Sequence, residues 1–144
     1  MPRTAPPSSR LPDALLERLC ERYPLLLRGW TELDPSLAPL AREIRCGRGW
    51  VSLLEVAFEA LESAIEDAMV EGARLRDMPS PYRVHERFGE LRIELLHPSE
   101  RSDRVVETAA QLSARLCPAC GAMDFLRDDR RTRCRRCKRG EKIS

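Results

Sequence analysis

Apolar residues recur at the spacing of an α-helix in several stretches of the chain. The longest stretch runs from about Trp50 to Glu71 and carries a broad apolar stripe, with its acidic residues largely off that stripe. A shorter stretch begins near Pro12, because proline suits the first helical position, and Pro24 ends or kinks it. We therefore expect a long central helix after a shorter first helix, and we interpret the glutamates of the central helix as its solvated face.

Two further helices are predicted on either side of the central one. The first would begin at Asp34, as the N-cap before Pro35, and end at Gly47. The second follows Pro98, has Ser102 as its N-cap, and leads directly to a pair of cysteines. Because no linker separates this helix from the cysteines, we expect the C-terminal segment to be docked on the rest of the chain.

Between residues 82 and 96 alternate residues are apolar, which indicates two β-strands. Gly89 and Glu90 lie between them, and glycine at the first central position suits a type II′ hairpin turn. The register that follows pairs Phe88 with Leu91, Glu86 with Ile93 and Val84 with Leu95. A lone hairpin is only marginally stable, so we expect it to pack on the central helix.

The composition indicates a chain that folds around an aliphatic core. Hydrophobic residues make up 42% of the 144 residues and charged residues 33%, whereas aromatic residues make up 5%. Residues 1–11 are rich in proline, and we expect a disordered leader there, without the apolar stretch of a secretory signal. No apolar run is long enough to cross a membrane. We therefore expect a cytoplasmic protein with reduced cysteines.

Four cysteines near the C-terminus form two C-x-x-C pairs separated by thirteen residues. The pairs are Cys117 with Cys120 and Cys134 with Cys137. This spacing is typical of a tetrahedral four-thiolate zinc site, in which each pair forms a tight turn. Gly121 follows the first pair, where glycine can adopt the positive φ that such a turn needs. We predict that the four sulfurs bind one zinc ion.

The predicted zinc site is closed, because protein ligands fill all four positions and leave none for water. We therefore expect a structural site, with two short strands between the cysteine pairs forming a zinc ribbon over residues 117–144. Iron in a rubredoxin-like site is the less favoured alternative. The other cysteines, Cys20 and Cys46, are interpreted as small buried side chains. His85 and His97 lack metal-type spacing to other residues.

Charge is distributed unevenly along the chain, whose formal net charge is +2. Residues 117–144 contain nine Lys or Arg against four Asp or Glu, so this segment is basic. It could neutralise nucleic-acid phosphates, dock on the acidic body, or simply be a solvated face. Because Phe125 is the lone aromatic residue in it, we do not expect stacking on single-stranded bases. The candidate binding residues are Arg127, Arg130, Arg131, Arg133, Arg135, Arg136, Lys138 and Arg139.

Three charged residues of the predicted hairpin require partners. Glu86 falls on the apolar side, where a carboxylate needs a cation or a shifted pKa. Arg87 and Arg92 are predicted to lie opposite each other on the other side, where like charges repel. An internal ion pair would satisfy these residues, and the alternative is a site for a phosphate or an acidic partner.

Four segments of the sequence resemble segments of a known group of proteins. They are Arg22-Tyr23-Pro24, Cys46-Gly47-Arg48-Gly49-Trp50, Glu86-Arg87-Phe88-Gly89-Glu90-Leu91-Arg92, and Ser113 through Cys117-Pro118-Ala119-Cys120-Gly121. In this order the chain resembles, over roughly residues 22–137, small cysteine-rich proteins of tailed phages and prophages. Those proteins usually carry a lysine-glutamate-lysine-phenylalanine-glycine-x-leucine-arginine segment before the cysteines. Here His85 replaces the first lysine, and Cys137 stands where many relatives have histidine. The resemblance implies a phage or mobile-element origin and a metal site, and no mechanism.

These patterns predict an α+β protein with a mainly helical body of about four helices and one β-hairpin over residues 12–116, closed by a C-terminal zinc ribbon. The leading expectation is a non-enzymatic zinc-binding phage or prophage accessory protein that binds nucleic acid through the basic ribbon. One alternative is a protein-protein interaction module or an inhibitor of a host protein, with zinc as a structural staple. Another is an enzyme that uses the hairpin carboxylates. No phosphate-binding loop or nucleophile elbow is present in the sequence, and no membrane or small-molecule partner is expected.

Overall fold

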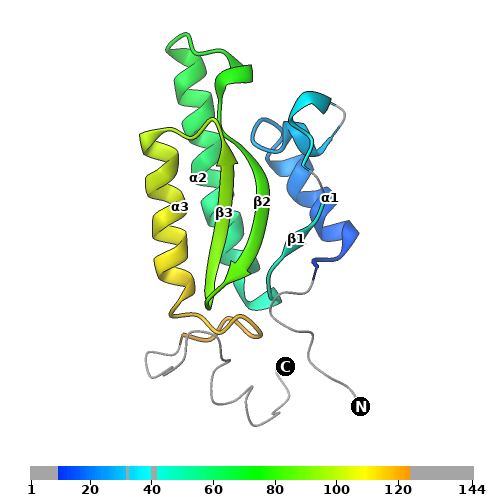
Figure 1. The fold of residues 1–144 in the computed structure, drawn as a ribbon, viewed down its shortest axis with the longest axis vertical. Helices are drawn as coiled ribbons and strands as arrows, with labels where there is room; N and C mark the ends of the chain where they lie inside the picture. The colour runs from blue at the N-terminus through cyan, green and yellow to red at the C-terminus, as the bar shows by residue number, and fades with distance from the viewer. Residues whose placement is uncertain (1–9, 32, 40–41, 124–144) are drawn as a thin grey trace.

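The computed structural model describes residues 10–31, 33–39 and 42–123, and this part of the chain forms an α+β fold (Figure 1). Its α-helices are α1 (Asp13–Arg22), α2 (Val51–Val70) and α3 (Glu100–Ser113). Its strands are β1 (Ile44–Arg45), β2 (Ser80–Arg87) and β3 (Glu90–Leu96). The expected first, central and last helices and the hairpin are therefore confirmed. The predicted zinc ribbon lies outside the described residues except for its first turn.

The sheet is mixed, with the order β1-β2-β3. β1 pairs in parallel with β2, and β2 pairs antiparallel with β3. A parallel pair needs a crossover connection, and α2 supplies it. The prediction does not include β1, because a strand of two residues is too short to show an alternation of apolar and polar positions. Leu11, expected in the disordered leader, is buried instead, and its N–H donates to the carbonyl of Ile44 over 2.8 Å.

The helix predicted between residues 34 and 47 is wrong. In its place the described residues form a 3-10 turn, Pro35–Leu37, followed by β1. Pro39 explains the difference, because the residue before a proline is disfavoured in the helical region. Ala38 accordingly has extended backbone angles, with φ −60° and ψ 130°.

The last helix begins earlier than predicted. Ser99 is the N-cap of α3, and its hydroxyl accepts a hydrogen bond from the N–H of Ser102 over 3.0 Å. In return the Ser99 N–H donates to the Ser102 hydroxyl over 2.7 Å, so the two serines form a reciprocal capping box. Ser102 is therefore the third helical residue and not the cap. The first helix, by contrast, begins one residue later than predicted, because Pro12 is the N-cap of α1 and not its first helical residue.

The hairpin turn differs from the predicted type and register. Phe88 and Gly89 are its two central residues, with φ of 53° and 78°, which defines a type I′ turn and not type II′. Arg87 therefore pairs with Glu90. The register is two residues from the predicted one, and an even shift leaves each side chain on its predicted face. Arg87 and Arg92 consequently do not lie opposite each other.

The core lies between the sheet and the helices. α2 and α3 lie side by side and pack on the sheet, whereas α1 lies on the side of β1 (Figure 1). The ring of Tyr23, just after α1, meets the ring of Phe58 in α2 edge-on, with centroids 5.8 Å apart. Trp30 and Trp50 are fully buried, so aromatic residues are few but central to the core. The buried positions of α2 are Leu54, Ala57, Phe58, Leu61 and Ile65.

Candidate metal centre

Residues 116–123, called the cysteine knuckle, follow α3 and form a tight turn around the first cysteine pair. The N–H of Gly121 donates to the carbonyl of Cys117 over 2.7 Å, and the Cys117 N–H donates to the carbonyl of Ala122 over 2.8 Å. Gly121 has a φ of 81°, the left-handed conformation predicted for the glycine after the pair. A backbone bridge joins the two ends of the knuckle as a short antiparallel pair.

The sulfur of Cys120 receives a backbone hydrogen bond from the N–H of Ala122 over 3.5 Å. An N–H group that points at a sulfur favours its thiolate, which is the form that binds zinc. Cys117 is fully buried and Cys120 is half-buried. The other predicted ligands, Cys134 and Cys137, lie outside the described residues. Within the described part no three metal-ligating side chains converge, so zinc binding by four cysteines stays a prediction.

Two glycines of the body form the surface on which the knuckle lies. A Cβ atom at Gly47 would lie 1.9 Å from the carbonyl oxygen of Pro118, and one at Gly49 would lie 2.2 Å from the carbonyl oxygen of Cys117. Both distances are far below van der Waals contact, so a side chain at either glycine would displace the knuckle. The Gly49 N–H also donates to the Pro118 carbonyl over 2.9 Å.

Trp50 completes the contact between the body and the knuckle. Its indole N–H donates to the carbonyl of Leu116 over 2.9 Å, and its side chain is fully buried. Trp50 ends a 3-10 turn, and α2 begins at the next residue. The knuckle is therefore attached to the start of the central helix, which confirms the expected docking for residues 117–123. We refer to Gly47, Gly49 and Trp50 as the cradle.

The cradle contains a repeated sequence motif that the prediction does not use. Arg-Gly-Trp occurs twice, at residues 28–30 and 48–50, and both copies form 3-10 turns with a buried tryptophan. In the first copy the indole N–H of Trp30 donates to the carbonyl of Pro81 over 2.6 Å. Each copy thus holds a distant backbone segment through its indole, and the second copy holds the cysteine knuckle.

The hairpin residues predicted as an anion or ion-pair site have separate partners. Glu86 accepts a hydrogen bond from the N–H of Gly89 over 2.6 Å, so within the described part of the chain its partner is the turn backbone and not a cation. Arg92 forms an ion pair with Glu90 at 2.6 Å. The guanidinium of Arg87 lies over the aromatic ring that follows it, 5.2 Å from the ring centre. The opposed arginines that motivated an anion site are thus not present in the described hairpin.

His85 and Glu86 do not form a catalytic pair. They lie on opposite faces of β2, because neighbouring residues of a strand alternate between its faces. The Nε2 atom of His85 lies instead 2.9 Å from a carboxylate oxygen of Glu94 on β3. The alternative of an enzyme that uses the hairpin carboxylates therefore gains no support from this geometry.

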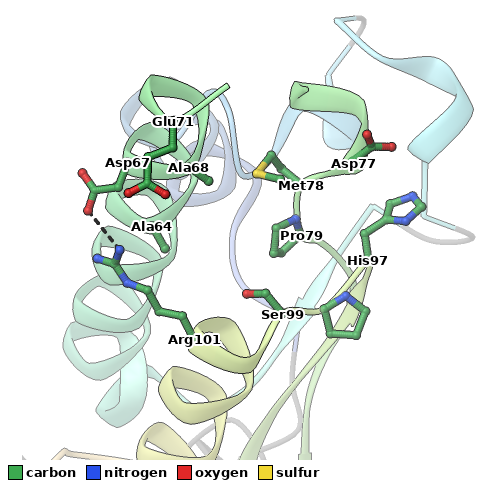
Figure 2. A pocket seen from close by; sticks show the side chains of 11 residues that line it. Ala64, Asp67, Ala68, Glu71, Asp77, Met78, Pro79, His97, Ser99 and Arg101 are labelled. Atoms are coloured by element: carbon green, nitrogen blue, oxygen red, sulfur yellow. Dashed lines mark hydrogen bonds and ion pairs between the residues drawn. The ribbon is translucent and has the colours of Figure 1, made fainter. Parts of the chain in front are cut away.

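A pocket of 310 Å³ lies at the other end of α2, away from the knuckle (Figure 2). Asp67, Glu71, Asp77 and His97 bring titratable side chains to it. Figure 2 shows Asp67 and Glu71 on one side and Asp77 and His97 on the other, so they surround no common centre. Asp67 forms an ion pair with Arg101 at 2.9 Å. We therefore do not assign a ligand to this pocket.

Cys46 is buried as predicted, and Cys20 is half-buried. Burial raises the pKa of the Cys46 thiol to about 12, and burial also raises the pKa of Cys20.

Among the described helices none is long and apolar enough to cross a membrane. Comparisons with protein-family models, with curated proteins and with solved structures found no match for this chain.

Proposed function

We propose that the chain is a non-enzymatic zinc protein that binds nucleic acid through its basic C-terminal segment. Its one structural zinc ion would be bound by Cys117, Cys120, Cys134 and Cys137. The observation that most supports the proposal is the geometry of the cysteine knuckle. The positive φ of Gly121 and the N–H···S hydrogen bond to Cys120 suit a pair of zinc ligands. Four protein ligands leave no position for a substrate, so the metal would stabilise the fold of the C-terminal segment and would not take part in a reaction.

Zinc binding would fix the basic residues close to the cradle. Eight arginine and lysine side chains occur between residues 127 and 139, on both sides of Cys134 and Cys137. If these two cysteines share an ion with the knuckle, the cations are held at the knuckle end of the molecule. A fixed cluster of cations suits the phosphate backbone, which dominates the affinity of most nucleic-acid-binding proteins.

The resemblance over residues 22–137 supports a role as a phage or prophage accessory protein. Two of the segments that carry it, residues 46–50 and 113–121, include the cradle and most of the knuckle, which lie in contact. The resemblance therefore coincides with the part of the fold that supports the cysteines. A cytoplasmic location belongs to the same proposal, because thiolate zinc sites persist in reducing compartments.

The proposal is tested by changing four arginines of the segment. Arg130, Arg131, Arg135 and Arg136 are replaced together by alanine, and zinc content and binding to labelled DNA and RNA are measured. We expect full zinc content, a large loss of affinity, and a shallower dependence of the binding constant on salt.

The matched control replaces four exposed arginines of the body. They are Arg18, Arg42, Arg74 and Arg76. This control should bind nucleic acid about as tightly as the wild type. Wild-type binding that is absent or insensitive to salt, or an equal loss in both variants, would exclude the proposed function.

A protein partner is the second candidate, favoured by an apolar groove of 250 Å³ between α2 and α3. Val56 and Leu112 line this groove and are 63% and 47% exposed. Large apolar side chains that share one exposed groove are typical of interaction sites. Replacing both residues by serine should abolish capture of a defined host protein and leave the zinc content unchanged. Capture that survives both substitutions would exclude this groove as the interface.

A further inference from the structure

Phe88 occupies a position that its residue type disfavours. It is the first central residue of the type I′ turn, with a φ of 53°. Glycine, asparagine and aspartate adopt this conformation far more readily than an aromatic residue does. The side chain is 58% exposed, so burial in the core does not compensate for the strained backbone. A strained residue held in place by its surroundings points to a functional role.

The hairpin tip is held rigidly on both sides of Phe88. On one side the carboxylate of Glu86 accepts a hydrogen bond from the N–H of Gly89 over 2.6 Å. On the other side the N–H of Leu91 donates to the buried hydroxyl of Ser113 over 2.7 Å, and the Leu91 side chain is fully buried. These contacts fix the backbone that carries the aromatic ring before any partner binds, which lowers the entropic cost of binding.

The tip lies at the same end of the molecule as the cysteine knuckle (Figure 1). Ser113, which holds β3 near the turn, is the last residue of α3, and the knuckle begins three residues later. The Arg87 guanidinium lies 5.2 Å from the centre of the Phe88 ring. Arg48, between the two glycines of the cradle, and Arg115, immediately before the knuckle, are exposed. An exposed ring beside a guanidinium favours an anionic partner with aromatic groups over an apolar protein surface.

We infer that Phe88 stacks on an unpaired base of a single-stranded nucleic acid, with Arg87 beside the stacked base. The inference rests on the proposed function and deepens it, because it names the form of nucleic acid that is bound. Stacking on an aromatic side chain needs an accessible base face and tolerates every base. Paired bases in a duplex are already stacked on each other and offer no such face. The hairpin therefore supplies the aromatic contact that the C-terminal segment lacks.

Replacing Phe88 by asparagine separates stacking from folding. Asn-Gly is a preferred sequence of the type I′ turn, so Phe88→Asn removes the ring while it retains the hairpin. Phe88→Tyr keeps an aromatic ring at the same place. Val70→Asn is the matched control, because Val70 is 88% exposed at the far end of α2. The zinc-loaded full chain is titrated into labelled oligothymidylate and into a DNA duplex of equal length at several salt concentrations.

We expect Phe88→Asn to weaken binding of oligothymidylate about tenfold, as is typical of losing one base stack, and to leave duplex binding unchanged. The salt slope should stay the same, since no phosphate contact is removed. Phe88→Tyr and Val70→Asn should bind like the wild type. A melting temperature at or above that of the wild type shows that Phe88→Asn remains folded.

Two groups of results would overturn the inference, and they have different consequences. If Phe88→Asn loses affinity equally for the single strand and the duplex, or loses none, stacking by Phe88 is wrong while the proposed function stands. If the wild-type chain binds neither nucleic acid, the proposed function fails and the inference fails with it.

Discussion

The indole N–H of Trp50 donates to the carbonyl oxygen of Leu116 over 2.9 Å, and the two residues are 66 positions apart in the sequence. Trp50 belongs to the buried core and immediately precedes α2, whereas Leu116 immediately precedes the first cysteine of the knuckle. This hydrogen bond thus connects the core of the body to the candidate metal centre. A change in the conformation of the knuckle should therefore alter the environment of the Trp50 indole.

Removal of zinc should shift the indole resonance of Trp50. The chain has two tryptophans, and Trp30 donates to Pro81, away from the knuckle. In a ¹H–¹⁵N spectrum of the zinc-loaded protein, a chelator should move or broaden the Trp50 indole signal and leave that of Trp30 nearly unchanged. The variant Trp50→Phe assigns the two signals. Identical spectra before and after chelation would show that the knuckle keeps its shape without metal.

Replacing Gly49 by alanine should weaken zinc binding. The new Cβ would lie 2.2 Å from the carbonyl oxygen of Cys117 and 2.3 Å from the backbone nitrogen of Gly121, so the knuckle must move. Groups that support metal ligands typically contribute about tenfold to hundredfold in affinity, and we expect a loss in that range. Competition with a chromophoric chelator measures it.

Gly72→Ala is the control for the cradle variant. Gly72 has a φ of 102°, and no described residue lies within 4 Å of a Cβ built there, so alanine strains the backbone without touching the knuckle. It should lower the stability of the fold by about 1 kcal/mol and leave the zinc affinity unchanged. Equal zinc affinity in Gly49→Ala and in the wild type would contradict the role assigned to the cradle.

The helices were predictable because each has a clear apolar stripe, and Cys117 and Cys120 stand out by their spacing alone. β1 was not predictable, because Ile44 and Arg45 become a strand only by pairing with Val84 and His85, forty residues later. The cradle was not predictable for the same reason. Small size at Gly47 and Gly49 matters only after the chain has brought the knuckle against them.

The hairpin shows how a local rule can be overridden. Turn chemistry places glycine first in a type II′ turn, yet the chain places Phe88 first and Gly89 second. The hydrogen bond from the Gly89 N–H to Glu86 stabilises this arrangement, and the buried contact of Leu91 with Ser113 fixes the register. These contacts depend on side chains at the hairpin and on α3, which a pattern of alternating apolar residues does not reveal.

Replacing Glu62 by alanine should destabilise the body, because this glutamate is not part of a solvated face. Its two carboxylate oxygens accept hydrogen bonds from the N–H groups of Leu25 and Leu26, over 3.1 Å and 2.7 Å. Leu26 is fully buried, so loss of the carboxylate leaves a backbone donor without its acceptor. We expect a loss of about 2 kcal/mol in the free energy of unfolding, measured with urea.

Glu66→Ala provides the comparison for Glu62, since Glu66 is exposed on the same helix. Its replacement should change the free energy of unfolding by less than about 0.5 kcal/mol. If both variants lose the same stability, a general effect of removing a glutamate from α2, and not the two backbone hydrogen bonds, would explain the result.

Cys46 should make the fold less stable at alkaline pH. Burial raises the pKa of its thiol from the ordinary value of 9.0 to about 12 in the folded protein. Between these pH values the folded chain keeps a proton that the unfolded chain has released. The contribution of Cys46 is therefore complete below pH 9 and is lost as the pH rises toward 12, with a slope of about 1.4 kcal/mol per pH unit.

The variant Cys46→Ala isolates this effect, because every other titrating group, including the predicted zinc ligands, is common to both proteins. Urea unfolding of the two proteins between about pH 8 and 10.5 should give free energies that converge or cross as the pH rises, with the wild type falling faster. A small buried side chain is lost in the variant, which shifts its curve by a constant amount at all pH values. Parallel curves over the whole range would mean that the Cys46 thiol titrates alike in the folded and unfolded chains.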